Sequence, residues 1–214
     1  MLVQKPAPNF KAQAVMPDNT FKQVSLSDYK GKKVVLFFYP LDFTFVCPSE
    51  IIAFDHKMAD FEKRDVQVLG VSIDSQFTHL AWKNTPVNKG GIGQVRFPLV
   101  ADVDKAIARA YDVLVGAQKA TVYTEEDEFD TTVGGGVALR ASFLIDEEGT
   151  VRHQVVNDLP LGRNVEDMLR MVDALSFHQK HGEVCPAGWR EGKPGMKATP
   201  DGVAAYLAEH SEKL

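Results

Sequence analysis

The chain has 214 residues, of which 44% are hydrophobic and 25% are charged, as in ordinary globular proteins. Lys and Arg number 24 and Asp and Glu number 29, so the net charge is −5 with neutral histidines. This composition excludes a disordered or collagen-like chain, and the acidic balance disfavours a nucleic-acid or anionic-membrane partner, which would need a basic face.

Two continuous apolar runs rich in β-branched and aromatic residues, at 33–39 and 66–73, predict strands buried on both faces. Apolar residues at helical spacing follow each run, from Pro48 and from Phe77, and predict a helix after each strand. The later elements expected in chain order are a strand at 97–101, a helix at 103–111, a hairpin at 141–146 and 150–156, and a long helix capped by Asn164. This order predicts an α/β, thioredoxin-like fold with a central mixed β-sheet flanked by helices and a C-terminal extension.

Two segments lack a regular pattern. Residues 115–136 combine an acidic block at 125–130 with three consecutive glycines, and we expect a mobile surface loop there. The tail is rich in Gly and Pro at 186–200, and a short amphipathic turn at 203–207 is then expected to dock on the body of the protein.

The length predicts one domain at 1–164, which the last long helix and the tail at 165–214 complete as one functional unit. The first ten residues lack the apolar core of a signal peptide. The longest apolar run, at 34–40, is much shorter than the ~20 residues of a spanning helix. We therefore expect a cytoplasmic protein without a membrane partner.

The two cysteines, Cys47 and Cys185, suggest chemistry, because disulfides in a reducing compartment are usually transient. Cys47 precedes Pro48 where a helix is predicted to begin, and the backbone N–H groups and dipole of a helix N-terminus favour a thiolate. Thr44 offers a hydroxyl three residues before the sulfur, and Glu50 can orient a guanidinium three residues after it. From position alone, a small buried structural cysteine remains an equal alternative.

The segment FYPLDFTFVCPSE at 38–50 closely resembles the peroxidatic-cysteine signature of the peroxiredoxins, the alkyl hydroperoxide reductase C and thiol-specific antioxidant family. The core of that signature is Pro-x-x-x-Thr-x-x-Cys. The segment HGEVCPAGW at 181–189 is similar to the resolving-cysteine motif of the typical two-cysteine subgroup. Further matches in the expected order occur at 6–10, 98–102 and 157–163.

This resemblance implies a thiol-dependent peroxidase that acts on hydrogen peroxide and organic hydroperoxides without a metal or organic cofactor. Cys47 would be the peroxidatic nucleophile, and its sulfenic acid would form a disulfide with Cys185 of the partner subunit in an antiparallel homodimer. Thioredoxin or a dedicated disulfide reductase would then reduce that disulfide. Family members assemble dimers into rings, often decamers, and the segment at 77–82 resembles a dimer–dimer contact.

The resemblance also assigns residues around the sulfur. Thr44 and Pro40 match positions of the active-site loop, and Arg140 matches the arginine that the family holds against the reactive sulfur. Glu50 and Arg163 match a pair that supports this arginine. Without the resemblance, Arg140 would be assigned to a solvated strand end, and the pair to the surface, where an ion pair contributes only ~0–1 kcal/mol.

A disulfide of Cys47 requires Cα atoms roughly 4.4–6.8 Å apart, so the start of its helix and the Cys185 tail must unwind locally. Gly90–Gly93 and Tyr206-Leu207 resemble the paired Gly-Gly-Leu-Gly and Tyr-Phe motifs of peroxide-sensitive members. If they hold the tail, Cys47 would be over-oxidised more readily; alternatively, they are a simple loop and a packing site. The acidic insertion around 117–134 departs from the family pattern, and we assign it no function.

Two other functions remain as alternatives. The first is a redox-switched holdase chaperone, a role that the family makes credible although no client-binding patch is evident. The second is a disulfide oxidoreductase of thioredoxin type, which the lack of a Cys-x-x-Cys motif disfavours. The six histidines show no zinc-like spacing with a cysteine, so no metal site is expected.

Overall fold

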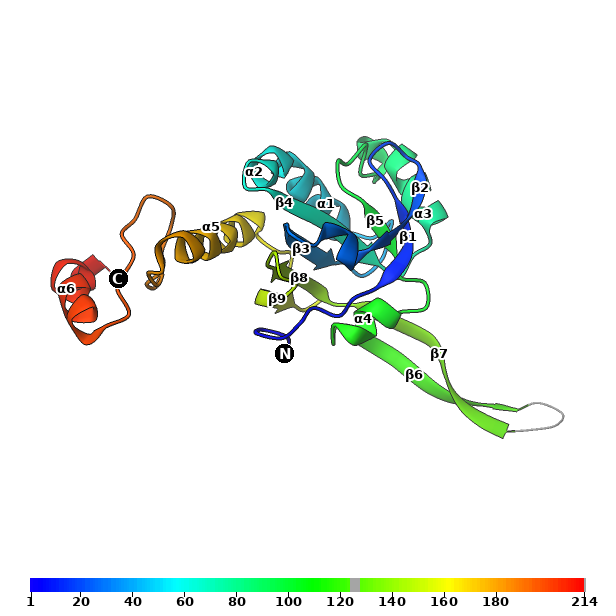
Figure 1. Cartoon of the computed structure of the whole chain (residues 1–214). Coiled ribbons are helices and arrows are strands. Elements are labelled where there is room, and N and C mark those ends of the chain that lie inside the picture. The colour runs from blue at the N-terminus through cyan, green and yellow to red at the C-terminus, as the bar shows by residue number, and fades with distance from the viewer. Residues whose placement is uncertain (124–127, 214) are drawn as a thin grey trace. The chain divides into compact units, whose positions relative to one another are not determined.

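The computed structural model describes residues 1–123 and 128–213 (Figure 1). The chain divides into two compact units, Met1–Arg163 and Asn164–Leu214. Among the described residues, no helix combines the length and the apolar character that spanning a bilayer requires.

A seven-stranded mixed sheet forms the centre of the first unit. Its strands lie in the order β2 (Phe21–Ser25), β1 (Lys11–Val15), β5 (Leu99–Ala101), β4 (Val66–Ser72), β3 (Lys33–Phe38), β8 (Arg140–Ile145) and β9 (Val151–Asn157). The central strands β5, β4 and β3 are parallel, and the outer pairs are antiparallel. The mixed sheet and the β8–β9 hairpin confirm the prediction. The edge hairpin of β1 and β2 was not predicted, because each strand has only five residues and the second, FKQVS, lacks an alternation of polar and apolar side chains.

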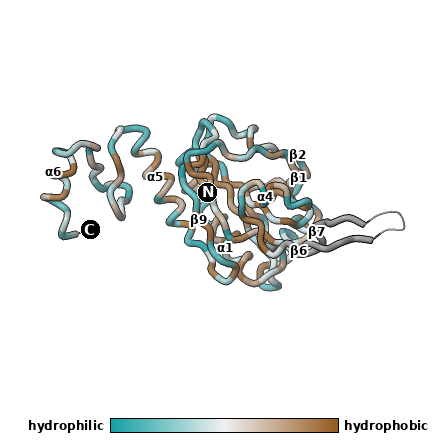
Figure 2. Tube along the Cα trace, turned by 90° about the horizontal axis from the view of Figure 1, so that it is seen from below, coloured by the Kyte–Doolittle hydropathy of each residue, from teal (hydrophilic) through white to brown (hydrophobic). Residues whose placement is uncertain are grey.

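Strand β3 builds a core on both faces of the sheet, since successive side chains point to opposite faces. On one face, the Phe37 ring stacks on Phe54 of α1 (Cys47–His56) with centroids 4.3 Å apart. On the other face, the centroid of the Phe38 ring lies 5.2 Å from that of Tyr111 and 5.8 Å from that of Phe143 in β8. Figure 2 shows the hydrophobic stretches of this unit concentrated in its interior. This double burial explains why residues 34–39 are continuously apolar.

The helices of the first unit are short. α1 is followed by α2 (Met58–Glu62), α3 (Gln76–Asn84) and α4 (Ala106–Ala110), with single 3-10 turns η1 (Leu26–Tyr29) and η2 (Val87–Lys89). The helix predicted at 103–111 is shorter than expected. Its start is set by the buried Asp102 carboxylate, which accepts the backbone N–H groups of Ile107 and Ala108 at 2.9 and 2.7 Å. The positive φ of Lys105 (+63°) also keeps the preceding residues out of the helix.

The prediction of a loop at 115–136 was wrong for the described residues. β6 (Leu114–Tyr123) and β7 (Glu128–Ala138) pair as a separate antiparallel ribbon that extends away from the main sheet (Figure 1). A register shift at Ala117/Gln118 and the positive φ angles of Gly135 and Gly136 interrupt the alternation that signals strands. Part of the acidic block, 125–127, lies outside the described residues, and the remainder begins β7.

The second unit begins with the predicted long helix, α5 (Val165–His181). The Asn164 side chain accepts the Glu166 N–H at its start, and Gly182 ends it with φ +68°. The tail then forms α6 (Pro200–His210) and the 3-10 turn η3 (Ser211–Lys213). The prediction of only a short turn in the tail was wrong, because Thr199 caps α6 and Pro200 suits its first position.

Candidate active site

Cys47 is the first residue of α1, and its side chain is fully buried. The loop of residues 39–46, here called the active-site loop, carries the chain from β3 to this helix. The first N–H groups of a helix have no partner within the helix, and its dipole is positive at that end. The position of the sulfur sets it beside these N–H groups, and its burial excludes water.

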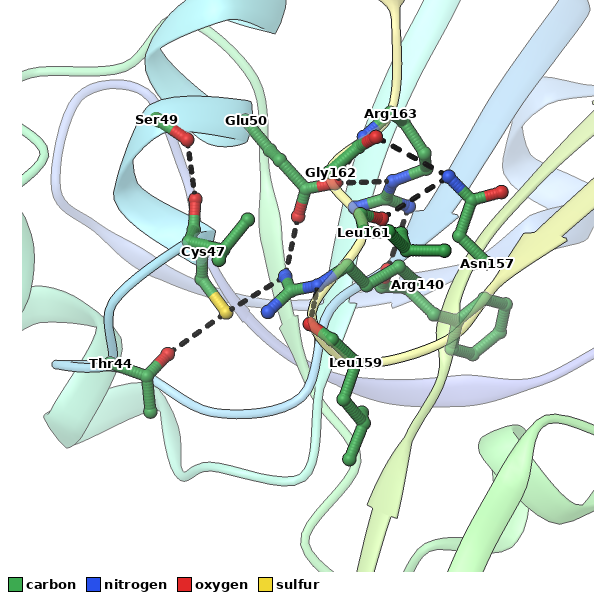
Figure 3. A network of polar contacts seen from close by, with 12 residues as sticks. Thr44, Cys47, Ser49, Glu50, Arg140, Asn157, Leu159, Leu161, Gly162 and Arg163 are labelled. Carbon is green, nitrogen blue, oxygen red and sulfur yellow. Dashed lines mark hydrogen bonds and ion pairs between the residues drawn. The ribbon is translucent and has the colours of Figure 1, made fainter.

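Two side chains donate hydrogen bonds to the Cys47 sulfur (Figure 3). The Thr44 hydroxyl lies 2.9 Å from Cys47 Sγ and 2.7 Å from the Leu41 carbonyl oxygen. Arg140 Nη1 lies 3.3 Å from the same sulfur. A hydroxyl has one proton and two lone pairs, so Thr44 can donate to the sulfur and still accept from another molecule.

A carboxylate behind the sulfur fixes the arginine. Glu50 Oε2 accepts from Arg140 Nη1 at 2.7 Å, and Glu50 Oε1 accepts from Arg163 Nε at 2.8 Å and from its backbone N–H at 2.9 Å. Arg140 Nε donates to the carbonyl oxygen of Leu159 at 2.5 Å. The side chains of Glu50, Arg140 and Arg163 are only 2%, 5% and 3% exposed. They form a buried network, and the alternatives of a surface ion pair and a solvated strand end are therefore wrong.

Arg163 connects this network to the sheet. Its Nη1 donates to the carbonyl oxygens of Phe38 and Ala141 at 2.7 and 2.6 Å, and its guanidinium carbon lies 5.4 Å from the centroid of the Phe37 ring. A cation at this distance from an aromatic ring is attracted to it. Arg163 thus joins β3, β8 and the Glu50 carboxylate at one point.

The charges of the network are mutually dependent. Burial raises the pKa of Glu50, but the hydrogen bonds and charge of Arg163 outweigh it, and the pKa lies below its usual value. Burial lowers the pKa of Arg163. Burial also opposes the charge on Arg140, but its contacts with Cys47 and Glu50 raise the pKa of this guanidinium. Two guanidinium groups and one carboxylate leave one positive charge, which a thiolate on Cys47 would neutralise.

The structure brings together five of the residues named from the sequence, namely Thr44, Cys47, Glu50, Arg140 and Arg163. Pro40 is buried at the start of the active-site loop. Cys185 belongs to the second unit, where its Sγ lies 3.4 Å from the carbonyl oxygen of Ala174 in α5. Burial raises the pKa of the Cys185 thiol, an effect that the charge of Arg170 partly offsets.

Two residues of the segment at 157–163 support the site in ways that their residue types do not indicate. The backbone carbonyl of Leu159 orients Arg140. At Gly162, a Cβ atom would lie 3.3 Å from Val46 Cγ1, so this glycine permits a close approach to the start of α1. The segment had been recognised as a family match, but a backbone contact cannot be read from residue types.

In the part of the chain that the structure describes, no group of three or more His, Cys, Asp or Glu side chains is arranged to hold a metal ion. Among the described side chains, the Thr44 hydroxyl and the Arg140 guanidinium reach the Cys47 sulfur.

Comparisons with known proteins show the family of this chain. Residues 3–154 match the AhpC/TSA family, and residues 174–209 match the C-terminal domain of 1-Cys peroxiredoxin. The chain is 57% identical to alkyl hydroperoxide reductase C of Helicobacter pylori over 100% of both chains, and 51% identical to peroxiredoxin-2 of Macaca fascicularis over 98% and 96%. A reduced 2-Cys peroxiredoxin of Plasmodium vivax superposes with a TM-score of 0.85 at 47% identity, covering 97% and 99% of the two chains. This protein therefore belongs to the AhpC/TSA family of peroxiredoxins.

Proposed function

We propose that this protein is a thiol-dependent peroxidase in which the Cys47 thiolate reduces hydrogen peroxide and organic hydroperoxides. The observation that supports this most directly is the convergence of Thr44 and Arg140 on a buried sulfur, with Glu50 fixing the arginine. A preorganised set of donors at the position where charge develops is usually the largest contribution to catalysis. This arrangement requires a nucleophilic sulfur and a peroxide, and no further cofactor.

In the first step, the thiolate attacks one peroxide oxygen. A sulfur–oxygen bond forms and the oxygen–oxygen bond breaks. The departing oxygen takes the electron pair, takes up one proton from solvent because the thiolate brings none, and leaves as water or an alcohol. Cys47 becomes a sulfenic acid. Thr44 accepts a hydrogen bond from the peroxide, and Arg140 donates to the oxygens as negative charge moves between them.

Three residues support this step without bond changes of their own. Glu50 and Arg163 keep Arg140 in place through buried ion pairs of 2.7 and 2.8 Å. Pro40, buried at the start of the loop, excludes water from the sulfenic acid. Water exclusion strengthens each of the charged contacts, because the effective dielectric constant is lower.

The second step uses Cys185 of the partner subunit in an antiparallel dimer. Its thiolate attacks the sulfenic sulfur, the sulfur–oxygen bond breaks as the disulfide forms, and the departing hydroxide takes up a proton from solvent and leaves as water. Because Cys47 is fully buried, the first turn of α1 must open before this attack. Both units therefore act as one functional unit, with 1–164 carrying peroxide reduction and 165–214 carrying resolution. Thioredoxin or a dedicated disulfide reductase restores the thiols.

A larger assembly is part of the proposal. Phe77 is 64% exposed and its ring lies 5.3 Å from that of Phe21. Phe43 is 51% exposed, and its ring lies 5.7 Å from that of Trp82 in the same helix as Phe77. Aromatic side chains are enriched in the cores of protein interfaces. We propose that this surface joins dimers into a ring, with a decamer as the expected size. The cycle consumes a thiol reductant at each turnover, which favours the reducing cytoplasm as its location.

Non-reducing gel electrophoresis after one equivalent of hydrogen peroxide tests this cycle. The wild type should give a dimer joined by two disulfides, and neither Cys47→Ser nor Cys185→Ser should give that doubly linked species. Peroxide consumption without a dimer would assign resolution to an external thiol. A wild-type protein that consumes no peroxide would refute the proposed function.

A further inference from the structure

A second buried polar cluster lies behind the active-site loop and has no role in the steps above. It consists of Tyr39, Asp42 and His79, and the side chains of Asp42 and His79 are fully buried. The Tyr39 hydroxyl donates to Asp42 Oδ1 at 2.9 Å, and His79 Nδ1 lies 2.7 Å from Asp42 Oδ2. His79 Nε2 lies 3.3 Å from the carbonyl oxygen of Val100 in β5. Both ring nitrogens of His79 therefore face an oxygen.

This cluster fixes the loop that carries Thr44. Asp42 precedes Thr44 by two residues, and its backbone N–H donates to Asp74 Oδ2 at 2.8 Å. The Ser72 hydroxyl at the end of β4 donates to the same oxygen at 2.7 Å. His79 belongs to α3, so Asp42 connects the active-site loop to β4, α3 and β5 at once.

The oxygens around His79 determine how many protons the pair of Asp42 and His79 must share. The Val100 carbonyl accepts but cannot donate, and an ionised Asp42 likewise only accepts. A neutral imidazole has one N–H, so beside an ionised Asp42 one ring nitrogen would turn its lone pair toward an oxygen. Two protons shared by the carboxyl group and the ring satisfy both contacts, either as carboxylate and imidazolium or as carboxylic acid and a ring protonated at Nε2. The two forms contain the same number of protons.

The surrounding groups favour retention of the second proton. Burial raises the pKa of Asp42, although the hydrogen bond and charge of His79 oppose this and the charge of Asp74 adds to it. Burial raises the pKa of Tyr39 well above its usual value, so its hydroxyl remains a donor. The Tyr39 hydroxyl oxygen also lies 3.4 Å from His79 Nδ1. Tyr39 and Asp74 are the other titratable groups that face the pair.

We propose that Asp42 and His79 form a two-proton clamp that positions the active-site loop, and that this clamp weakens when the pH rises and one proton leaves. The inference rests on the proposed peroxidase function and adds a positioning residue, His79, that does not contact the sulfur. After loss of one proton, an acceptor faces an acceptor in a fully buried site, which is strongly disfavoured. The loop then shifts, and Thr44 no longer lies beside Sγ.

Two variants distinguish an effect of the shared protons from a purely structural effect of the Asp42 and His79 side chains. In Asp42→Asn, the amide oxygen still accepts from Tyr39, and the amide N–H can donate to Nδ1 of a neutral His79 that keeps its proton on Nε2. This variant should retain the clamp at high pH. His79→Leu leaves Asp42 buried without its partner and should loosen the loop at neutral pH. His56→Asn, at an exposed histidine at the end of α1, is the matched control.

The test is the second-order rate constant for Cys47 oxidation by hydrogen peroxide, measured in competition with a haem peroxidase between about pH 6 and about pH 9.5. The wild type and His56→Asn should lose activity on the alkaline side by about tenfold, the scale of a small misplacement at an active site. Asp42→Asn should keep its activity there, and His79→Leu should be about tenfold slower at neutral pH. An alkaline loss that is the same in Asp42→Asn as in the wild type, or no alkaline loss in the wild type, would overturn the proposal.

A readout independent of activity is the ¹⁵N NMR spectrum of the histidine rings in the reduced protein. We expect His79 Nε2 to carry a proton at neutral pH and the pair to release one proton over the range in which the wild-type rate falls. An unprotonated Nε2 at neutral pH would contradict the clamp. Because this spectrum requires no peroxide, it tests the clamp even if the wild type proves inactive, which would instead refute the proposed function.

Discussion

The two cysteines stand in opposite environments. Cys47 is fully buried at a helix N-terminus, with the Thr44 hydroxyl and the Arg140 guanidinium on its sulfur. Cys185 is half-buried in the second unit, its sulfur contacts a backbone carbonyl, and burial raises the pKa of its thiol. A carbonyl accepts from a thiol and gives no stabilisation to a thiolate. The folded chain thus surrounds the Cys47 sulfur with hydrogen-bond donors and sets the Cys185 thiol against an acceptor, and the proposed function accordingly gives the first attack to Cys47.

The largest expected effect comes from Glu50→Gln, which removes the negative charge between Arg140 and Arg163. Removing one partner from a buried charged network lowers the free energy of unfolding by about 3–5 kcal/mol. Urea unfolding should show a loss of this size at neutral pH. The matched change at an exposed carboxylate, Glu62→Gln, should leave the free energy of unfolding nearly unchanged.

The Glu50 network also predicts a pH dependence. Because the fold lowers the pKa of Glu50, its ionisation stabilises the folded state above the unfolded value of about 4.5, and this contribution disappears as the pH falls through the lower folded value. The wild type should lose stability in this acidic range more steeply than Glu50→Gln does. Equal slopes of the free energy of unfolding against pH in the two proteins would contradict this assignment.

The next effect is on the reaction itself. Arg140→Met removes the donor that contacts both Cys47 Sγ and Glu50 while keeping much of the side-chain volume. Loss of one preorganised donor typically lowers a rate by about 10²–10³-fold. Stopped-flow measurement of the reaction with hydrogen peroxide should show this drop, and alkylation of Cys185 should proceed at an unchanged rate. A variant that retained the wild-type rate would remove Arg140 from the mechanism.

A smaller effect is expected at Thr44. Thr44→Val preserves the shape of the side chain but removes the hydroxyl that lies 2.9 Å from the sulfur. The rate with peroxide should fall about tenfold, the equivalent of about 1.4 kcal/mol for one hydrogen bond. Thr44→Ser keeps the hydroxyl and should recover most of the rate. If the valine and serine variants reacted equally fast, the hydroxyl would have no role.

The smallest effect concerns the tail. Deleting the chain from Pro200 onward removes α6, including Tyr206 and Leu207. If that segment restrains the release of Cys185, the shortened chain should form its disulfide sooner and survive excess peroxide a few-fold better, because resolution competes with over-oxidation. Mass spectrometry of the sulfinic acid on Cys47 measures this competition. Unchanged inactivation would favour the simple packing interpretation of these residues.

Patterns with a strong physical period were predicted well. The run at 33–39 must be apolar on both faces because β3 lies in the middle of the sheet, with Phe37 and Phe38 in opposite cores. Asn164 caps α5 as its residue type indicated. The ribbon of β6 and β7 was missed, because its glycines and its register shift disrupt the alternation on which strand prediction depends.

Some contacts of the active site could likewise be predicted from the sequence, and others could not. Cys47, Thr44 and Glu50 lie within one short segment, so their closeness follows from the start of a helix. Arg140 and Arg163 come from distant parts of the chain, and only the family resemblance associated them with the sulfur. The backbone carbonyl of Leu159 and the clamp of Asp42 with His79 depend on the path of the main chain. Such contacts cannot be derived from residue type and spacing.

The most direct test of the central claim is a competition between the two cysteines within one chain. The reduced protein would receive about one-tenth of an equivalent of hydrogen peroxide with dimedone present to trap sulfenic acid, and peptide mass spectrometry would locate the adduct. We expect the adduct on Cys47 and none on Cys185, and this preference should shrink in Arg140→Met. An adduct distributed equally over both cysteines in the wild type would contradict the claim that the buried network activates Cys47.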